Sequence, residues 1–455
     1  MQPARPDTSP KDPQAATLHR ILREHLETFF AEREATGQAL PAFVVNELRD
    51  FLRCGVLAYG AARFKCDACG RERLCALSCK GRGFCPRCLG RRMTDLAKHL
   101  VTRVLPRVRV RQWVLSLPFD LRLRLAFHHD LALEVHELMA RAIESRYRAR
   151  ARKLGHKGAR GGSVTVIHRA GSDLRLNIHF HLLALDGVYI DEPGGGRRFV
   201  TIAAPTLDEM QKLLAVIVKR ITRLLDRRGL GDHDAIADDD TALASAARSV
   251  RGLGVTQHVP DDHDPDETAN PFSRLKARID QFDLDASTTV GHRRRDRLEP
   301  LCRYLLRPPL ADRRLRLLDD GQIALELKRP WSNGTTWLTM SPTTFLERLA
   351  SLVPRPHKNT ILYRGVLAGH SNARADVVPK REPVPSSCHS TWCELMKHGL
   401  GIDVLACPCG ERMRHVATVL KRDSLARLLR AHGYADTALP IRAARAPPQT
   451  ELFGA

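Results

Sequence analysis

Cysteines crowd one short stretch of this sequence. Seven of the 12 cysteines in the 455-residue chain lie between Cys54 and Cys88. The preceding segment from Met1 to Ala16 is polar and dotted with prolines, without the apolar stretch of an export signal, so we expect a cytoplasmic, reducing environment. In such an environment clustered cysteines indicate metal ligands rather than disulfides. The stretch therefore predicts a metal-binding module.

Two Cys-x2-Cys pairs in this stretch have the spacing of zinc ligands. They are Cys66 with Cys69 and Cys85 with Cys88, and two such thiolate pairs can close a tetrahedron around zinc. All four positions are then filled by protein, so we expect the zinc to be structural rather than catalytic. The competing interpretation is a group of buried thiols without metal. A second site or an alternative fourth ligand stays open because three cysteines are left over: Cys54, Cys75 and Cys79.

Glycines accompany both cysteine pairs. Gly70 directly follows the first pair, and Gly90 follows the second by two residues. Glycine permits the tight turn in which backbone N–H groups point at a metal-bound sulfur. We therefore expect a knuckle of this kind at each pair.

The chain as a whole is strongly basic, with 73 lysines and arginines against 51 acidic residues and a net charge of +22. Neutralising phosphates supplies the sequence-independent part of nucleic-acid affinity, so this excess favours a nucleic-acid partner over a mere solubility charge or an anionic membrane. The cysteine stretch shares the bias, and we expect its arginines, among them Arg82 and Arg87, to contact DNA. No apolar run approaches the roughly 18 residues of a membrane span, so no membrane partner is expected.

Hydrophobic periodicity and turn signals predict both helices and strands. The expected helices span residues 17–53 in two segments, 91–105, 121–147, 206–228 and 296–306. The expected strands span residues 111–117, 163–169, 176–185, 322–328 and 335–340, the second and third as a hairpin. Thr206 is the expected cap of its helix, and Asn333-Gly334 the expected turn between the last two strands. The acidic segment 231–270 is expected to form surface loops around one strand-like piece, residues 251–259.

One expected strand carries a His-x-His pattern. Alternate residues of a strand share a face, so His179 and His181 project side by side, with Asn177 next to them. Two imidazoles on a rigid strand form half of a site for a divalent ion. The alternative is a pair of half-exposed strand histidines without metal.

His168, on the preceding strand, is the candidate third ligand. If Arg169 pairs with Leu176 in the hairpin, His168 lies opposite Asn177 and on the same face as the His-x-His pair. A slip of one residue would turn it to the other face.

An arginine-rich helix carries the candidate nucleophile. Tyr304 has Arg303 beside it and Arg307 one helical turn on. A phenol has a pKa near 10, so ionising it at pH 7 costs about 4 kcal/mol, which guanidinium groups, a base or a metal ion can offset. The two arginines would also hold a phosphate. Tyr147, which also lies among arginines, is the rival, and the alternative for Tyr304 is an amphipathic core tyrosine.

These residues lie in blocks that resemble a known family. The chain is similar to the transposases of the insertion-sequence ninety-one family in the runs CDACGRERLCALSCKGRGFCPRCLGRR, VRQWVLSLPFDLR, LNIHFHLLALDGVYI, LCRYLLRPPLADRRL and LKRPWSNGTT. The similarity extends over residues 54–354, with a looser match through HSTWCELMKHGLGIDVLACPCG. The family belongs to the HUH (His, hydrophobic, His) class of single-strand endonucleases, which implies rolling-circle transposition.

The resemblance also implies roles and a fold. The His-x-His pair would bind Mg²⁺ or Mn²⁺, Tyr304 would attack DNA, and the two cysteine pairs would hold zinc. The implied α+β fold has an N-terminal helical and zinc-ribbon-like domain, an antiparallel sheet with flanking helices, and a small C-terminal domain. The histidines would lie on a central strand that faces the tyrosine helix. The expected domains are residues 1–53, 54–105, 106–318 and 319–455.

Two positions depart from the family pattern. Two-tyrosine members carry Tyr-x3-Tyr, whereas Pro300 stands four residues before Tyr304, so this chain resembles the single-tyrosine branch. Near the C-terminus a Cys-Pro-x-Cys-Gly pattern is replaced by Cys407-Pro408-Cys409-Gly410. Thiols one residue apart make a poor zinc knuckle, so no metal is expected there.

The sequence therefore predicts a transposase that nicks single-stranded DNA at element ends and joins it to a target through a 5′-phosphotyrosine intermediate. Arg303 and Arg307 would stabilise the charge of the transition state. Two other functions stay open. One is a zinc-dependent DNA-binding regulator without catalysis, and the other is a plasmid replication initiator that uses the same chemistry.

Overall fold

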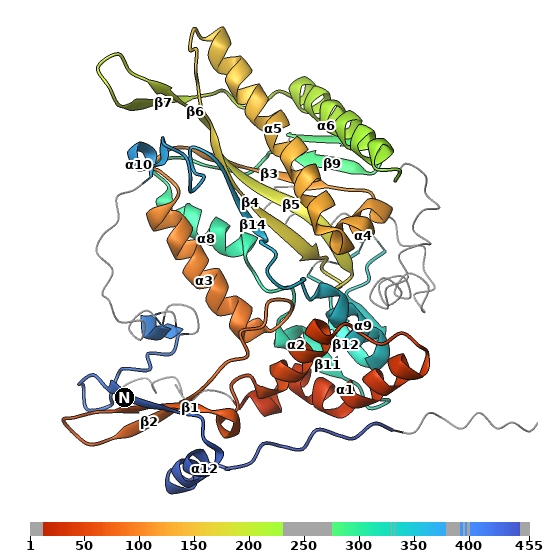
Figure 1. The fold of residues 1–455 in the computed structure, drawn as a ribbon, viewed down its shortest axis with the longest axis vertical. Coiled ribbons are helices and arrows are strands. Elements are labelled where there is room, and N and C mark those ends of the chain that lie inside the picture. The colour runs from red at the N-terminus through yellow and green to blue at the C-terminus, as the bar shows by residue number, and fades with distance from the viewer. Residues whose placement is uncertain are drawn as a thin grey trace, which may run out of the picture.

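The computed structural model describes residues 12–230, 275–328, 330–331, 333–378, 392–394, 396–397 and 401–445. The acidic segment and the strand-like piece expected within residues 231–270 lie outside these ranges. Within the described ranges, no helix is long and apolar enough to span a membrane. The fold is α+β, as predicted, with helices packed on antiparallel sheets (Figure 1).

A seven-stranded sheet forms the centre of the fold. Its order is β14-β4-β5-β3-β9-β8, with β10 also paired to β3, and every pairing is antiparallel. The strands are β3 (Val110–Ser116), β4 (Gly162–Ala170), β5 (Leu176–Leu185), β8 (Lys276–Ile279), β9 (Phe282–Asp285), β10 (Thr289–Val290) and β14 (Ile361–Gly365). The predicted hairpin is confirmed as β4 and β5, and β5 lies inside the sheet between β4 and β3.

Helices cover both faces of this sheet (Figure 1). One face is covered by α4 (Phe119–Phe127), α5 (His129–Lys153) and α6 (Leu207–Arg227). The other is covered by α3 (Pro86–Arg103) and α8 (Arg295–Leu305).

The residues of β5 alternate between two apolar cores. Phe180 and Leu182 pack in the core beneath α4 and α5, whereas Leu183 packs with α3 and α8. Alternate residues of a strand share a face. His179 and His181 are separated from Leu183 by an even number of positions, so they share its face and point to the side of α3 and α8.

The prediction of a single helix over residues 121–147 is wrong, because the structure has two helices there. His128 adopts φ −105° and ψ 82°, outside the helical region, and separates α4 from α5. The break lets α4 pack against β5 while α5 packs against α6. Phe127 and Leu131 are buried on either side of the break, so the apolar pattern of the sequence continues through it.

Helix caps explain two further boundaries. The predicted cap Thr206 is confirmed: its side chain accepts the backbone N–H of Glu209, and the Glu209 carboxylate accepts that of Thr206. Helix α3 begins at Pro86, five residues before the predicted start at 91. Proline fits the first turn of a helix, where its missing N–H is not needed.

The remaining elements surround the central sheet. The N-terminal helices are α1 (Thr17–Ala35) and α2 (Ala42–Arg53), near the short turns η1 (Pro13–Ala15) and η2 (Leu57–Tyr59). A hairpin is formed by β6 (Gly187–Asp191) and β7 (Arg197–Thr201). A second sheet has the order β15-β1-β2, from β15 (Arg414–Val419), β1 (Ala61–Lys65) and β2 (Glu72–Ala76). A third contains β11 (Leu315–Leu317), β12 (Ile323–Glu326) and β13 (Trp337–Met340). Short helical elements complete the fold: η4 (Asp312–Arg314), α9 (Pro342–Leu352), α10 (Arg374–Val377) and α12 (Arg422–Ala431).

The region expected as a small C-terminal domain, residues 319–455, contributes strands to three sheets. Strands β12 and β13 are neighbours, as the two predicted β runs require, while β14 joins the central sheet and β15 pairs with β1. The domain boundaries themselves stay a prediction.

Candidate metal and phosphate site

Three histidines from two neighbouring strands meet on the α3–α8 side of the central sheet. His168 on β4 pairs directly with His179 on β5, two residues from His181. The ring centroids lie 4.2 Å apart for His168 and His181, 4.9 Å for His179 and His181, and 5.0 Å for His168 and His179. One ring nitrogen of each lies within 4.8 Å of the others, so the set could hold a metal ion.

A β-bulge brings His168 to this face. Near the turn, Ala170 pairs with Leu176. The next pair is His168 with His179, so one residue of β4 but two residues of β5 lie between the two pairs, and β5 contains one extra residue. Without the bulge, His168 would lie opposite Ile178 and would point into the other core. The predicted pairing of Arg169 with Leu176 is off by one residue, and the bulge restores the predicted face.

Hydrogen bonds fix the rings of the two β5 histidines. His179 donates from Nδ1 to the carbonyl of Asn177 at 2.9 Å, which leaves Nε2 with its lone pair. His181 Nδ1 lies 2.9 Å from the side-chain amide of Gln112, a buried residue of β3. Partners of this kind orient metal-binding imidazoles and select their tautomer.

Burial keeps all three imidazoles uncharged. It lowers the pKa of His179 to about 4 and, together with the neighbouring His179, the pKa of His168 to about 3. The pKa of His181 is also lowered well below its usual value, chiefly by burial. A metal ion needs the neutral imidazole, so the site is ready for a metal at neutral pH.

A buried oxygen extends the donor set. The Oδ1 atom of Asn177, which lines the same cavity, is buried and has no hydrogen-bond partner. Buried polar atoms are nearly always paired, and a metal ion would satisfy this one. Three neutral imidazoles and an amide oxygen therefore fit a divalent cation.

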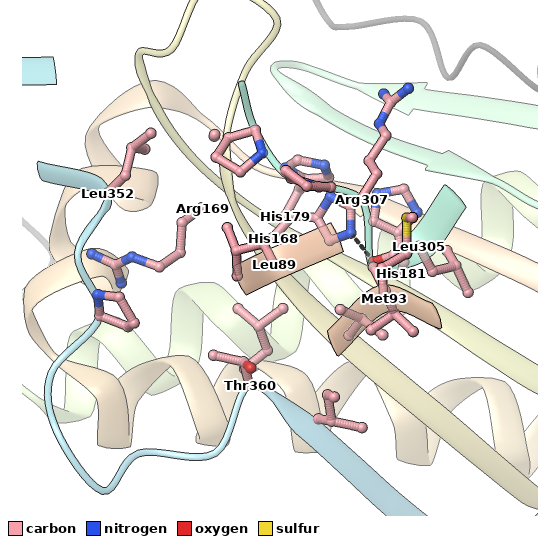
Figure 2. Close-up of a pocket in the computed structure, with 18 of the residues that line it drawn as sticks. Leu89, Met93, His168, Arg169, His179, His181, Leu305, Arg307, Leu352 and Thr360 are labelled. Atoms are coloured by element: carbon pink, nitrogen blue, oxygen red, sulfur yellow. Dashed lines mark hydrogen bonds between the residues drawn. The ribbon is translucent and has the colours of Figure 1, made fainter. Parts of the chain in front are cut away.

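Tyr304 lies beside the histidines, at the end of α8. Its ring centroid is 6.3 Å from that of His181. The link to the sheet is direct, because His168 Nε2 donates to the carbonyl oxygen of Leu305 at 2.6 Å (dashed in Figure 2). The guanidinium of Arg307 lies 4.2 Å from the centroid of the Tyr304 ring and donates to its hydroxyl at 3.3 Å.

These groups line one cavity of about 200 Å³. Figure 2 shows the three histidines gathered there with Arg307. Among the described residues that line it, five are basic and none is acidic. The basic residues are Arg82, Arg92, Arg169, Arg307 and Lys328. Such a lining suits an anion, above all a phosphodiester.

Of the other three predicted DNA-binding arginines, Arg303 and Arg87 lie away from the cavity. Arg303 forms an ion pair with Glu299 one turn earlier in α8, at 2.9 Å, and is not among the residues that line the cavity. The guanidinium of Arg87 packs against Gly55. Arg82 does reach the cavity, and the Glu47 carboxylate accepts the backbone N–H of Arg82 at 2.9 Å.

The rival tyrosine lies in the core. Tyr147 is 2% exposed, donates to the Asp186 carboxylate at 2.9 Å and accepts from the Trp113 indole at 3.4 Å. Burial raises its pKa far above the usual value. A buried phenol that resists ionisation is a poor nucleophile.

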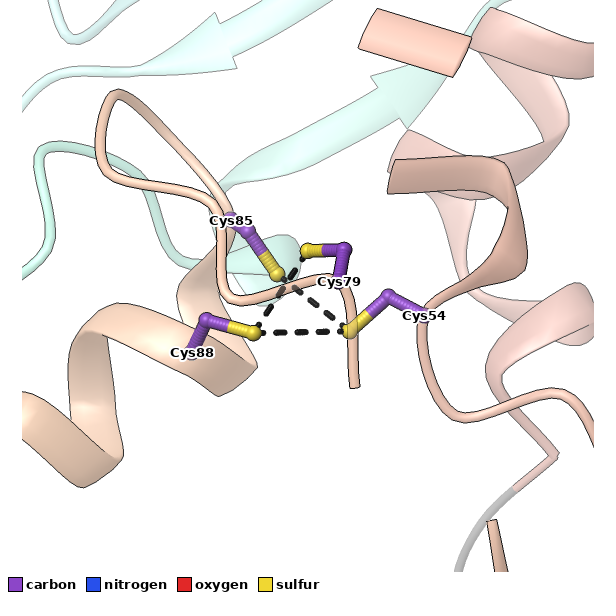
Figure 3. A group of neighbouring side chains, drawn as sticks. All are labelled: Cys54, Cys79, Cys85 and Cys88. Atoms are coloured by element: carbon purple, nitrogen blue, oxygen red, sulfur yellow. Dashed lines mark hydrogen bonds between the residues drawn. The ribbon is translucent and has the colours of Figure 1, made fainter. Parts of the chain in front are cut away.

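The structure corrects the predicted grouping of the four zinc ligands. Cys85 and Cys88 gather with two of the leftover cysteines, Cys54 and Cys79, and this group is called the first quartet (Figure 3). Cys54 follows α2, and the other three lie in the loop before α3 and in its first turn. Three of the sulfur–sulfur distances are 3.5 to 3.6 Å, close to the edge of about 3.8 Å of a zinc tetrathiolate with bonds of 2.3 Å.

The expected knuckle at Gly90 is wrong, because that glycine lies within α3. The knuckle of the first quartet lies instead at Cys79, whose sulfur accepts the backbone N–H of Gly81 at 3.3 Å. Lys80 takes the positive φ of the turn, at 57°.

Cys66 and Cys69 belong to a separate group with Cys407 and Cys409, called the second quartet. The expectation that no metal site involves Cys407 and Cys409 rested on their own spacing. The second pair of donors comes from the other end of the chain, which spacing along the sequence cannot show.

Sequence reasoning missed two residues that surround the histidines. Gln112 is a buried polar residue of β3, between Arg111 and Trp113, and nothing in this local sequence marks it as the partner of His181. Lys328 follows β12 and reaches the cavity only through the tertiary fold, so nothing local marks it.

Two family models match the chain. A model described as "Putative transposase" matches residues 162–374, and a model described as "Transposase zinc-binding domain" matches residues 21–117. Together they cover more than half of the sequence. The first range contains the three histidines and Tyr304, and the second contains the whole first quartet. No curated protein and no solved structure matches the chain.

Proposed function

The chain belongs to the insertion-sequence ninety-one family of transposases, and from this premise we propose that it cuts and rejoins single-stranded DNA in rolling-circle transposition. The observation that carries the proposal is one cavity that joins three neutral imidazoles, a tyrosine and five basic side chains. Acidic residues are missing from its described lining. Each of these components has a place in phosphoryl transfer.

Tyr304 is the proposed nucleophile. Its phenolic oxygen forms a bond to phosphorus while the bond from phosphorus to the 3′ oxygen of the preceding nucleotide breaks. The phenol loses its proton and the departing oxygen gains one, which leaves a 5′-phosphotyrosine and a free 3′-hydroxyl. The new ester conserves the energy of the broken bond, so joining to a target strand needs no nucleotide cofactor.

Two basic side chains, Arg307 and Lys328, would hold the phosphate. Arg307 contacts the Tyr304 hydroxyl and lines the cavity, where Lys328 also lies. Their charges offset the cost of ionising the phenol and stabilise the charge that develops on the phosphoryl oxygens. Arg303 pairs with Glu299, so we assign it no contact with the reacting phosphate.

His168, His179 and His181 would hold the catalytic cation, with the amide oxygen of Asn177 as a further donor. An imidazole-rich set favours Mn²⁺ over the harder Mg²⁺. When bound, the cation supplies Lewis-acid polarisation of the scissile phosphate.

A single tyrosine would serve both strand-transfer steps. Tyr304 is the only tyrosine among the described residues that line the cavity. Pro300 occupies the position one helical turn earlier in α8, where a second nucleophile would have to stand. We therefore propose that the phosphotyrosine is resolved by the 3′-hydroxyl of the target strand, which frees the same phenol.

The first quartet would hold the structural zinc of the zinc-binding domain. Its loop, residues 79–85, also carries Arg82 to the cavity, and Glu47 on α2 accepts the backbone N–H groups of Arg82 and Gly83. Zinc at this quartet would therefore fix one basic residue of the DNA site.

The test is formation of a covalent adduct. Purified full-length protein is incubated with Mn²⁺ and single-stranded oligonucleotides from the ends of the encoding element, labelled at either end. A 3′ label should stay with the protein in denaturing gels, whereas a 5′ label should leave on a shorter strand. Tyr304→Phe should abolish the adduct. Tyr363→Phe, a matched change on β14 of the central sheet, should keep it.

Other outcomes would point to other functions. An adduct that persists in Tyr304→Phe would assign the nucleophile elsewhere. DNA binding without cleavage, unchanged by His179→Ala, would favour a zinc-dependent regulator. Specific cleavage at a plasmid origin, and none at the element ends, would favour a replication initiator.

A further inference from the structure

We propose that the chain holds a second zinc ion at the second quartet, Cys66, Cys69, Cys407 and Cys409. This site would fasten the C-terminal segment to the N-terminal zinc-binding domain. It is separate from the first quartet and from the histidine site, and it does not depend on the proposed reaction. Its two halves are far apart in sequence: Cys69 and Cys407 are separated by 338 positions.

The sulfur geometry matches one tetrahedral ion. The Sγ atoms of Cys69 and Cys407 lie 3.5 Å apart, and those of Cys66 and Cys409 lie 3.6 Å apart. All four sulfurs lie within 4.8 Å of one another. These separations are close to the edge of about 3.8 Å of a zinc tetrathiolate, and they are far longer than a disulfide bond of about 2.05 Å.

The half of the site that comes from the N-terminal domain is a tight turn. Gly70 has a φ of +71°, and its N–H donates to the carbonyl of Cys66 at 2.9 Å. The N–H of Arg71 then points at the sulfur of Cys69. Backbone N–H groups that point at sulfur stabilise the thiolate, which is the form that binds metal.

The half that comes from the C-terminal segment repeats this turn. Gly410 has a φ of +97°, and its N–H donates to the carbonyl of Cys407 at 3.0 Å. The N–H of Glu411 points at the sulfur of Cys409. Each cysteine pair is thus followed by a glycine and by a backbone N–H directed at sulfur, although one pair has two spacer residues and the other has one.

Two nearby cysteines show what an ordinary core thiol looks like in this region. Cys75 and Cys393 are buried in the same small apolar cluster as Cys66 and Cys407, but they belong to neither quartet. By contrast, Cys69 and Cys409 are exposed. Apolar burial therefore does not explain why four thiols converge, because two of them lie at the surface.

The site lies where the C-terminal segment adds a strand to the N-terminal domain. β15 pairs with β1 to complete the β15-β1-β2 sheet, and Figure 1 shows the blue C-terminal segment beside β1 and β2. α12 then packs Leu425 and Leu429 against Leu74 of β2. Both apolar clusters here are small, and small cores commonly need a metal or disulfide staple.

The exposure of the two quartets should make the second zinc easier to remove. Cys54, Cys85 and Cys88 of the first quartet are buried, whereas half of the second quartet is exposed. A chelator reaches an exposed site first. Loss of the zinc ion from the second quartet should release the segment from β15 onward, while the first quartet keeps its own ion.

Metal content of the full-length chain tests the site. In a His179→Ala/His181→Ala background, which removes the histidine site, we expect two zinc ions per chain, and one after Cys407→Ser/Cys409→Ser is added. Cys75→Ser, a buried thiol of the same cluster, should keep two. One zinc ion per chain in this background before the cysteine changes, or two after them, would overturn the proposal.

A measurement on the unaltered chain covers the case in which the variant fails to fold. After exchange with ¹¹³Cd, the protein should give two resonances in the tetrathiolate region. Limited chelation should remove one of them and increase amide exchange in β1 and β15, with α3 unchanged. A single tetrathiolate resonance, or a pair lost together while β1 and β15 stay protected, would contradict a separate second site.

Discussion

Acidification distinguishes a buried, preorganised histidine site from three ordinary histidines. Protons compete with metal for imidazole nitrogen, so the pKa values of the free ligands set how binding responds to pH. Burial lowers the pKa of His179 to about 4 and that of His168 to about 3, and it lowers the pKa of His181 well below its usual value. The three rings therefore stay neutral far below pH 6.5.

The size of the effect follows from these values. At pH 5.5, an imidazole of ordinary pKa 6.5 is protonated about ten to one, so three of them would weaken metal binding by about a thousandfold. An imidazole with a pKa of about 4 is only about 3% protonated at that pH. We therefore expect the Kd for Mn²⁺ to change by less than about twofold between pH 7.5 and 5.5.

Calorimetric titration of Mn²⁺ into the full-length chain at these two pH values, at constant ionic strength, measures the change. His181→Ala serves as the control, because it reports any Mn²⁺ that binds away from the site. If acidification weakens the His181-dependent binding a hundredfold or more, the histidines are ordinary and the argument from burial is wrong.

Three further outcomes follow from buried contacts. Gln112→Leu removes the amide that orients His181 and should weaken Mn²⁺ binding by about 10- to 100-fold in the same titration, with an unchanged far-UV spectrum. Asp186→Asn leaves Arg109 and Arg111 without their shared buried carboxylate and should lower the free energy of unfolding in urea by about 3–5 kcal/mol. For the metal-free chain, the unfolded state takes up protons below pH 6.5 while the folded site does not. Its free energy of unfolding should therefore fall between pH 6.5 and 4, by up to about 1.4 kcal/mol per pH unit for each site histidine.

The central strand and its histidine pair could be predicted because they depend on local alternation. His179 and His181 are two residues apart on a strand, so their side chains share a face independently of the rest of the fold. The face on which His168 lies depends on the register of the hairpin. A β-bulge sets that register, and no turn residue in the sequence predicts the bulge. Tyr304 could be placed on a helix by its pattern, but its approach to the histidines depends on the contact between His168 and the carbonyl of Leu305.

The proposed zinc ligands are harder to group from the sequence than to identify. The spacing of Cys66 with Cys69 and of Cys85 with Cys88 marks each pair as a ligand pair, but it does not say which pairs share an ion. That depends on where Cys54 and Cys407 lie in space, at the end of α2 and before β15. Strand pairing across the whole chain sets these positions, and the same long-range pairing brings β14 into the central sheet.

In the proposed reaction the phenol of Tyr304 and the three imidazoles act on one phosphorus atom. Trapped adduct from the unaltered chain, trimmed with nuclease, digested with trypsin and sequenced by tandem mass spectrometry, tests it at the level of the residue. The expected result is a 5′-linked nucleotide on the peptide that contains Tyr304, formed with Mn²⁺ and lost when His179 and His181 are replaced. A nucleotide on any other side chain, or an adduct that forms equally well without those histidines, would contradict it.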